Sequence, residues 1–261
     1  MSRDTTIDPR AVVDPGAQLG EGVYVGPFCV VKRAVSIGDR CRLDAHVVVE
    51  GPTVLGADNH VSAFASVGGA PQDLKYDGEP TRLEIGARNR IRECTTLNRG
   101  TVGGGGVTRI GDDNLFMAYA HVGHDCLIGS RIIFANAATL AGHVEVGDDA
   151  TVGACSGIHQ FCRVARHAFI GGYSVVTQDA LPWVMTVGNR AESHGLNVIG
   201  LRRKGYPAAT IRALKTCYMT LFRSKKKLDE AMLEVEETLG DIEEVRYFIE
   251  FVRSSERGVV R

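Results

Sequence analysis

The sequence predicts a mainly β fold, a parallel β-helix built from six-residue repeats, followed by a small helical domain. Two observations predict the β-helix: an apolar residue recurs at every sixth position over most of the chain, and glycine directly follows twelve of these positions. A period of six fits neither an extended strand, whose period is two, nor a helix, whose period is 3.6. It fits a solenoid in which three short strands make one turn and each contributes one inward side chain. Residues 18 apart, three repeats, then lie one above another.

The repeat runs through three blocks of the chain, and none of its 26 positions is polar. Burial of each aliphatic side chain contributes about 1.5–3 kcal/mol, largely offset by the ordering of the chain, so the stability of such a solenoid is collective. The repeating positions are Ile7, Val13, Leu19, Val25, Val31, Ile37, Leu43, Val49, Leu55, Val61, Val67; Ile85, Ile91, Leu97; and Ile110, Phe116, Val122, Ile128, Phe134, Leu140, Val146, Val152, Ile158, Val164, Ile170, Val176.

Two stretches interrupt the repeat, residues 68–84 ("GGAPQDLKYDGEPTRLE") and residues 98–109 ("NRGTVGGGGVTR"). Loops that leave a regular solenoid frequently carry function, so both are candidate parts of a site. The four glycines at 103–106 do not have the pattern of a phosphate-binding loop, because no Gly-Lys-Ser/Thr follows and no helix is predicted to begin there. We expect them to form a flexible loop.

The repeat ends near Leu181, and we expect a solenoid over residues 1–190 and a domain of about three helices over residues 191–261. The stretch "PAATIRALKTCYMTLF" spaces its apolar residues on one helix face. The next helix, "LDEAMLEVEETLG", ends at Gly240 as a C-cap, and "DIEEVRYFIEFVRSSER" begins at Asp241 as an N-cap. Two basic clusters, residues 202–204 and 223–227, lie in this domain and can be either solvated helix ends or a binding surface.

Composition limits the class of partner and the compartment. The net charge of −1 argues against a general binder of nucleic acid. No apolar run approaches the roughly 20 residues that cross a bilayer, and the first ten residues lack the apolar segment of a secretory signal, so we expect no stable membrane insertion. Seven cysteines, an odd number without a Cys-x-x-Cys pair, indicate reduced thiols and a cytoplasmic protein.

The solenoid period brings scattered polar residues together. His124, Gly142 and Gln160 are 18 apart and form one predicted column on the surface of the solenoid. The neighbouring column is Asp125, His143 and Phe161, while His121 lies above Thr139 and His159 precedes Gln160. We therefore expect a polar cluster over three adjacent turns.

Three interpretations of this cluster compete. The histidines can be structural hydrogen-bonding residues on turns. They can bind zinc, as three histidines do in the gamma-class carbonic anhydrases, which are also hexapeptide solenoids, but the spacing 121, 124, 143 does not match that family. They can supply a general base, since a histidine near neutral pKa accepts a proton from a hydroxyl group while a carboxylate fixes its tautomer. Gly142 beside His124 can then offer a backbone N–H to an oxyanion, and these two groups suffice for acyl transfer.

Five motifs along the chain carry a resemblance to a known family. In order they are "QDLKYDGEPT", "HVGHDC", "ATLAGHV", "HQFC" and "GLRRKG". On a hexapeptide solenoid with a helical tail, this series closely resembles the UDP-N-acetylglucosamine O-acyltransferases, over essentially the whole chain. The resemblance implies a left-handed β-helix. It also implies the transfer of an (R)-3-hydroxyacyl chain from acyl carrier protein to the glucosamine 3-hydroxyl, the first step of lipid A synthesis.

The resemblance also implies a role for each matched residue. His124 matches the general base, Asp125 its orienting carboxylate, and Gly142 the oxyanion donor. Gly172 and Phe169 match positions that limit the length of the acyl chain. The residues that match substrate-binding positions are Gln72, Asp73, Lys75, His121, His143, His159, Gln160, Asn197 and Arg203.

Family membership would further imply a homotrimer with its sites between neighbouring solenoids, and no metal or organic cofactor, because the thioester donor is already activated. The helical domain and its basic clusters would face the acidic carrier protein. Three positions depart from the family pattern: Asn98, Arg190 and Ile199. Three other functions remain open: a related acyltransferase that prefers a 3-amino sugar nucleotide or a short acyl-CoA, a zinc lyase of the carbonic anhydrase type, and a catalytically silent scaffold.

Overall fold

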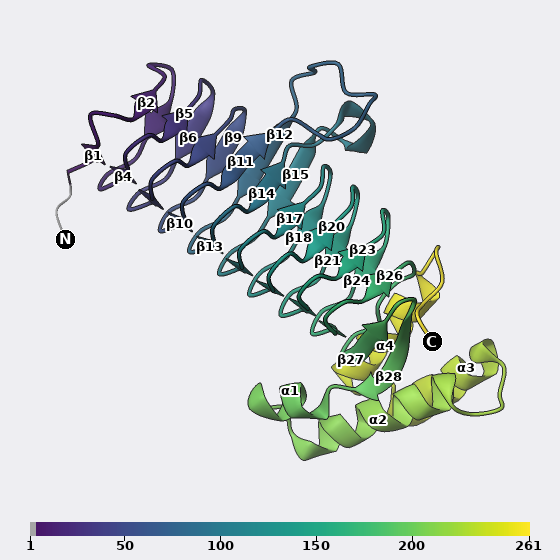
Figure 1. The fold of residues 1–261 in the computed structure, drawn as a ribbon. Coiled ribbons are helices and arrows are strands. Elements are labelled where there is room, and N and C mark those ends of the chain that lie inside the picture. Colours follow the sequence, from purple (N-terminus) through teal and green to yellow (C-terminus); the bar gives the residue numbers. More distant parts are fainter. Residues whose placement is uncertain (1–3) are drawn as a thin grey trace.

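Each hexapeptide repeat forms one very short parallel strand, and strands three repeats apart pair with each other. The structure, a computed structural model, describes residues 4–261. Its strands make three sheets that form the sides of a left-handed parallel β-helix, with helices at the carboxy-terminal end (Figure 1). The predicted fold is confirmed. Below, corner 1 joins the first to the second sheet, corner 2 the second to the third, and corner 3 the third to the first.

The three sheets have these strands in sequence order. The first sheet contains β1 (Thr6–Ile7), β4 (Tyr24–Val25), β7 (Arg42–Leu43), β10 (His60–Val61), β13 (Arg90–Ile91), β16 (Leu115–Phe116), β19 (Ile133–Phe134), β22 (Thr151–Val152), β25 (Phe169–Ile170), β27 (Val184–Gly188) and β28 (Ala191–Leu196). The second contains β2 (Val12–Val13), β5 (Val30–Val31), β8 (Val48–Val49), β11 (Ser66–Gly69), β14 (Thr96–Asn98), β17 (His121–Val122), β20 (Thr139–Leu140), β23 (Gly157–Ile158) and β26 (Val175–Val176). The third contains β3 (Gln18–Leu19), β6 (Val35–Ile37), β9 (Thr53–Leu55), β12 (Arg82–Ile85), β15 (Val107–Ile110), β18 (Leu127–Ile128), β21 (Glu145–Val146) and β24 (Arg163–Val164).

The repeating apolar residues fill the inside of the solenoid, as predicted. From Val25 to Val176 every one of them is buried. The exceptions are the three of the first turn: Ile7 is exposed, and Val13 and Leu19 are half-buried. No earlier turn within the described residues covers them, so these three side chains pack only against the turn that follows.

The corners hold residues in the left-handed backbone region. Examples are His46 (φ 62°), Asp125 (φ 60°) and His143 (φ 60°), which each follow an inner apolar residue by three positions. This conformation costs a residue with a side chain about 1–2 kcal/mol. The stacked turns maintain it, because the corner N–H bonds the preceding turn. The N–H of His143, for example, donates to the carbonyl of His124 (2.9 Å).

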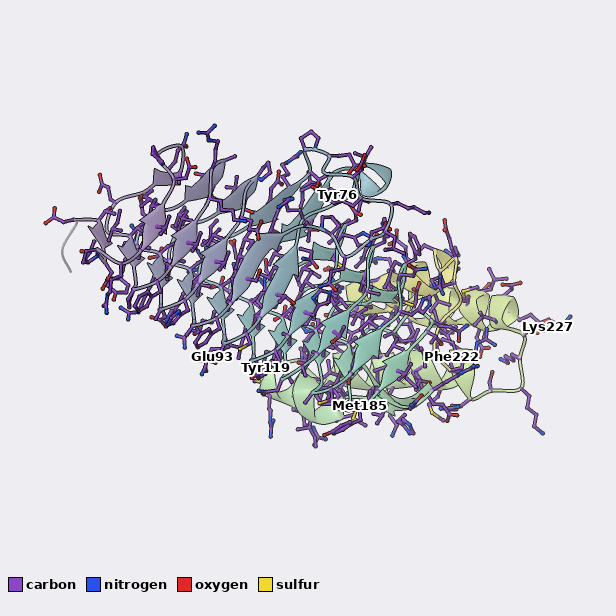
Figure 2. The ribbon with its side chains drawn as sticks, turned by 45° about the horizontal axis from the view of Figure 1, so that its top comes forward. Tyr76, Glu93, Tyr119, Met185, Phe222 and Lys227 are labelled. Atoms are coloured by element: carbon purple, nitrogen blue, oxygen red, sulfur yellow. The ribbon has the colours of Figure 1, made fainter. Side chains whose placement is uncertain are left out.

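The two interruptions leave the solenoid without disturbing its core. Leu83 of β12 pairs with Thr53, thirty residues earlier instead of eighteen, so the first insertion adds twelve residues. Arg109 of β15 pairs with Glu84, twenty-five residues earlier, so the second adds seven. Both insertions connect the second to the third sheet and therefore project at corner 2. Figure 2 shows Tyr76 of the first insertion on one side of the solenoid and Tyr119, at corner 1, on another.

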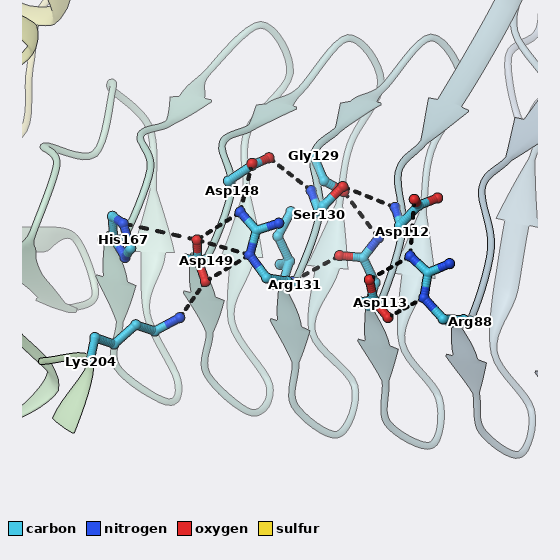
Figure 3. A network of polar contacts seen from close by, with 12 residues as sticks. Arg88, Asp112, Asp113, Gly129, Ser130, Arg131, Asp148, Asp149, His167 and Lys204 are labelled. Carbon is cyan, nitrogen blue, oxygen red and sulfur yellow. Dashed lines mark hydrogen bonds and ion pairs between the residues drawn. The ribbon is translucent and has the colours of Figure 1, made fainter.

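Charged residues form a ladder along corner 3 (Figure 3). Arg88 binds Asp113 (2.8 Å), and two turns further Arg131 binds Asp149 (3.0 Å). Asp149 also pairs with Lys204, which lies just after the first helix. Burial raises the pKa of the Asp149 carboxyl, but hydrogen bonds from Arg131 and Lys204 outweigh it, and the net pKa is lowered. The ladder thus ties the helical segment to the solenoid.

The carboxy-terminal end is closed by a hairpin and four helices. β28 pairs antiparallel with β27, and the chain continues into α1 (Val198–Arg203), α2 (Ala208–Phe222), α3 (Leu228–Leu239) and α4 (Glu243–Arg253). The longer three are the predicted helices, and they bury an apolar cluster with Trp183 at the end of the solenoid. No helix within residues 4–261 is both long and apolar enough to cross a bilayer.

One cap prediction is confirmed and one is wrong. Gly240 is the C-cap of α3. Asp241 is not the N-cap of α4: that position is Ile242, whose side chain makes no capping bond. Instead, Glu243 and Glu244 place negative charge in the first turn, where it complements the helix dipole.

Candidate active site

The histidine cluster and both insertions meet at corner 2. His121 is on β17 of the second sheet, and His124 and Asp125 occupy the corner that follows. One turn further, Gly142 and His143 occupy the same corner. The solenoid therefore brings together residues that the predicted columns placed side by side.

His124 and Asp125 form a hydrogen-bonded pair. Nδ1 of His124 lies 2.8 Å from Oδ2 of Asp125, whose side chain is completely buried, whereas the imidazole is 16% exposed. An ionised carboxylate accepts hydrogen bonds only, so it fixes the proton of a neutral imidazole on Nδ1. Nε2 bonds no other residue among 4–261 and is left as a proton acceptor.

The second insertion holds the carboxylate of Asp125. The backbone N–H of Thr101 donates to Oδ1 (2.8 Å), and the Thr101 hydroxyl donates to Oδ2 (2.6 Å). The backbone N–H of Asp125 in turn donates to the hydroxyl oxygen of Thr108 (2.8 Å). The sequence did not point to Thr101 or Thr108, because insertions break the 18-residue columns that would have aligned them with Asp125.

Gly142 lies against the imidazole of His124. A Cβ atom at Gly142 would lie 2.4 Å from Cε1 and 2.6 Å from Nε2, so any other residue here would require the ring or the backbone to shift. The N–H of Gly142 has no hydrogen-bond partner within the described chain. It is therefore available to an oxygen atom bound beside His124.

His143 and His121 surround this pair as neutral side chains. The rings of His143 and His124 are perpendicular with centroids 5.1 Å apart, and His143 stacks on Phe161 at 4.4 Å. Nδ1 of His121 bonds the hydroxyl of Thr96 (2.7 Å). Burial lowers the pKa of both histidines, because removal from water disfavours the charged imidazolium. Both are therefore neutral near pH 7.

The cluster also contains possible metal ligands. Ligand atoms of His124, Asp125 and His143 lie within 4.8 Å of one another. His121 is not among them, so the three histidines do not form a zinc set. Both oxygens of Asp125 accept hydrogen bonds from Thr101 and His124, which favours a base with its orienting carboxylate.

Comparison with known proteins identifies the family. A family model described as UDP N-acetylglucosamine O-acyltransferase, Domain 2, matches residues 179–260. A solved LpxA from Acinetobacter baumannii is 43% identical, with a TM-score of 0.95, over 98% of this chain and 99% of the other. LpxA from Moraxella catarrhalis is 42% identical with the same TM-score and the same two coverages. An Arabidopsis UDP-N-acetylglucosamine acyltransferase is 36% identical over 98% and 100% of the chains, with a TM-score of 0.86.

The chain belongs to the UDP-N-acetylglucosamine O-acyltransferase family.

The first insertion carries three residues that the family resemblance assigns to the sugar: Gln72, Asp73 and Lys75. Asp73 lies close enough to His143 for its charge to act on the pKa of that histidine, and its carboxylate accepts the N–H of Lys75 (3.0 Å). The insertion is anchored to the end of β14, since Asn98, the last residue of that strand, donates to the carbonyl of Ala70 (3.0 Å). Asn98, one of the three residues that depart from the family pattern, is therefore buried and holds the first insertion of this acyltransferase in place.

Arg99, next to Asn98, anchors the same insertion. Its side chain is buried, donates to the carbonyl of Gly68 and bonds the hydroxyl of Tyr76 (3.0 Å). Neither the repeat nor the motifs indicated this residue.

His159 and Gln160 continue the histidine surface toward the carboxy terminus. Nδ1 of His159 lies 3.1 Å from the carbonyl oxygen of Gln160 and 3.4 Å from a guanidinium nitrogen of Arg257. A cavity of about 560 Å³ lies between corner 2 and this terminal segment, lined by His143, Phe161, Arg257 and their neighbours. Neither the repeat nor the five motifs pointed to Arg257.

The remaining family positions lie elsewhere in the same acyltransferase chain. Asn197 caps α1 by accepting the N–H of Gly200 (2.9 Å), and it lines a pocket with Asp149 and His167 at corner 3. Arg203 ends α1. The two departures Ile199 and Arg190 are both exposed, Ile199 in α1 and Arg190 in the β27–β28 turn.

The two positions that the resemblance assigns to acyl-chain length also lie away from corner 2. Phe169 is on β25 of the first sheet, and Gly172 follows that strand at the start of corner 1.

Proposed function

We propose that this acyltransferase moves an (R)-3-hydroxyacyl chain from acyl carrier protein to the 3-hydroxyl of UDP-N-acetylglucosamine, the first step of lipid A synthesis. The observation that carries the proposal is the His124–Asp125 pair beside Gly142. Neither Nε2 of His124 nor the N–H of Gly142 has a hydrogen-bond partner within residues 4–261. General-base catalysis of this kind contributes typically about 10²–10⁴-fold.

The chemical step follows from these groups. Nε2 of His124 removes the proton of the 3-hydroxyl while the oxygen attacks the thioester carbon. The carbonyl oxygen becomes an oxyanion that the N–H of Gly142 stabilises. The intermediate collapses, the C–S bond breaks, and the thiolate of the carrier takes the proton from the imidazolium. Asp125 stays ionised throughout and stabilises the imidazolium.

A homotrimer with sites between chains is part of the proposal. It is supported by the position of Asn197 and Arg203, which lie by corner 3 rather than beside His124. A neighbouring chain would bring them to corner 2. Co-purified mixtures of the inactive variants His124→Ala and Arg203→Ala should regain activity, because some sites in mixed trimers receive both native residues. Variants that stay inactive when mixed would contradict the shared site.

Acyl carrier protein is the proposed donor partner in the cytoplasm. In the basic clusters, Lys204 and Lys226 pair with Asp149 and Glu234, but Lys225 and Lys227 form no ion pair within residues 4–261. Free lysines attract an acidic carrier and accelerate its association. Charge reversal of Lys225 and Lys227 should raise KM for the donor and leave KM for UDP-N-acetylglucosamine unchanged.

The proposed reaction is tested with His124→Ala. We expect mass spectrometry to detect acylated UDP-N-acetylglucosamine with the native protein and a (R)-3-hydroxyacyl carrier protein, and almost none with the variant. His60→Ala, which removes an exposed histidine on the first sheet, is the matched control. Native turnover by His124→Ala would exclude His124 as the base. Faster turnover of a 3-amino sugar nucleotide by the native protein would move the acceptor to that alternative.

A further inference from the structure

The glycine-rich insertion is built around the carboxylate of Asp125. It leaves the solenoid after β14, forms the short helix η1 (Val102–Gly104) and returns at β15. A Cβ atom at Gly104 would lie 2.0 Å from Cγ of Asp125, and one at Gly100 would lie 2.7 Å from Oδ1. By contrast, a Cβ at Gly103 would meet nothing within 4 Å. The glycines at 100 and 104 therefore allow the insertion to close directly over Asp125.

One residue of the insertion satisfies both oxygens of that carboxylate. Thr101, itself buried, donates its N–H to Oδ1 and its hydroxyl to Oδ2. Oδ2 also receives Nδ1–H of His124. The threonine hydroxyl and the imidazole thus share one acceptor atom, and the position of the hydroxyl determines which lone pair the imidazole can use.

This arrangement matters because the carboxylate is completely buried. A buried charge needs several hydrogen bonds, and water does not reach Asp125 to replace one that is lost. Without the hydroxyl, Oδ2 would keep a single hydrogen bond, the one from His124, with Nε2 of His143 at 3.7 Å, and the carboxylate could turn about its Cβ–Cγ bond. The ring of His124 would follow it and move away from Gly142.

We infer that Thr101 is a positioning residue for the proposed reaction: its hydroxyl and N–H fix the Asp125 carboxylate so that Nε2 of His124 points at the acceptor hydroxyl. The inference rests on the proposed role of His124. It assigns to the second insertion a part in the chemical step. Support of the first insertion comes instead from Asn98 and Arg99, at the end of β14.

Thr101→Val tests the inference, with Thr101→Ser as the rescuing variant. Valine keeps the shape but removes the hydroxyl, and we expect kcat to fall roughly 10- to 100-fold while KM for UDP-N-acetylglucosamine stays within about twofold. The acidic limb of the kcat/KM profile should move to higher pH, because a carboxylate with one hydrogen bond fewer favours the imidazolium more strongly. Thr101→Ser should restore most of kcat and the native limb.

Thr108→Val is the matched control for stability. It also removes a buried hydroxyl that bonds Asp125, but the bond is to the backbone N–H. We expect Thr108→Val to lower the melting temperature about as much as Thr101→Val does, and to leave the acidic limb of the kcat/KM profile at its native pH. If Thr101→Val keeps the native kcat and limb, or changes them no more than Thr108→Val does, the inference is overturned.

The two levels of the proposal fail separately. Native turnover by His124→Ala would refute the proposed base whatever Thr101 does. An inactive His124→Ala together with a fully active Thr101→Val would refute only the positioning role. Should Thr101→Val fold poorly, Thr101→Ala with kinetics measured on the folded fraction replaces it, and the same shift of the pH limb is required.

Discussion

The backbone of Gly142 lies in contact with the imidazole ring of His124, one turn below it in the β-helix. A methyl group at Gly142 would overlap both Cε1 and Nε2, at 2.4 Å and 2.6 Å. Gly142→Ala therefore has to displace the ring from Asp125. We expect kcat to fall by about 100-fold or more, since a displacement near 1 Å can have that effect. Kinetics with UDP-N-acetylglucosamine and acyl carrier protein donor measure the loss.

Gly157→Ala is the control for that variant, because a Cβ atom there would meet nothing within 4 Å. It should retain native activity and stability. Full activity of Gly142→Ala would show that the ring of His124 tolerates displacement by a methyl group.

A second matched pair lies in the glycine-rich insertion. Gly104→Ala would place a methyl group on the Asp125 carboxylate, whereas Gly103→Ala adds one in open space. We expect Gly104→Ala to lose activity and to unfold at a lower temperature, and Gly103→Ala to resemble the native protein. Equal behaviour of the two variants, measured by kcat and thermal unfolding, would contradict a closed insertion.

Gly172 gives a prediction about the donor. A Cβ atom at this position would lie 3.3 Å from the carbonyl oxygen of Ala154, a tight contact that requires the neighbouring backbone to shift by a few tenths of an ångström. If this position limits the acyl chain, as family resemblance implies, Gly172→Met should favour donors several carbons shorter. Competition among carrier proteins with different (R)-3-hydroxyacyl lengths measures the preference. An unchanged preference would place the limit elsewhere, with Phe169 the next residue to replace.

Stability should fall as the pH is lowered from about 7.5 to 5.5. Burial lowers the pKa values of His121, His143 and His167 below the ordinary 6.5, so each binds a proton more readily in the unfolded chain. Their contribution is complete above pH 6.5 and is lost as the pH falls from that value through the lowered pKa values of the folded state. Thermal unfolding across this range should show the decrease, and His167→Asn should show a smaller one. A midpoint that is constant or rises toward pH 5.5 would contradict it.

The repeat allowed most of the fold to be predicted, because a period of six identifies the inner residue of every strand. The exceptions follow from the surroundings of individual elements. Ile7 is exposed because it belongs to the terminal turn. α1 has only six residues, too few for a helical period to show, and Asp241 precedes the true cap of α4.

The candidate site was predictable where the repeat is unbroken. Between His121 and Phe161 no insertion occurs, so counting by 18 brought His124 and Gly142 together correctly. Thr101 lies before β15, in the second insertion. The path of this insertion depends on hydrogen bonds with Asp125, which comes 24 residues later in the sequence. Nothing in the local sequence encodes that contact except the glycines that allow close approach.

The two ends of the β-helix differ in how they are finished. At the carboxy-terminal end, β28 and the helices cover the last turn, whereas among the described residues no strand pairs with the outer edges of β1, β2 and β3. A free sheet edge can recruit a second chain, and charged side chains such as the Asp8–Arg10 pair oppose this. Removal of the helical segment would create a second free edge on the same molecule. The helices therefore leave the described β-helix with unpaired strand edges at one end only, which does not permit repeated end-to-end addition.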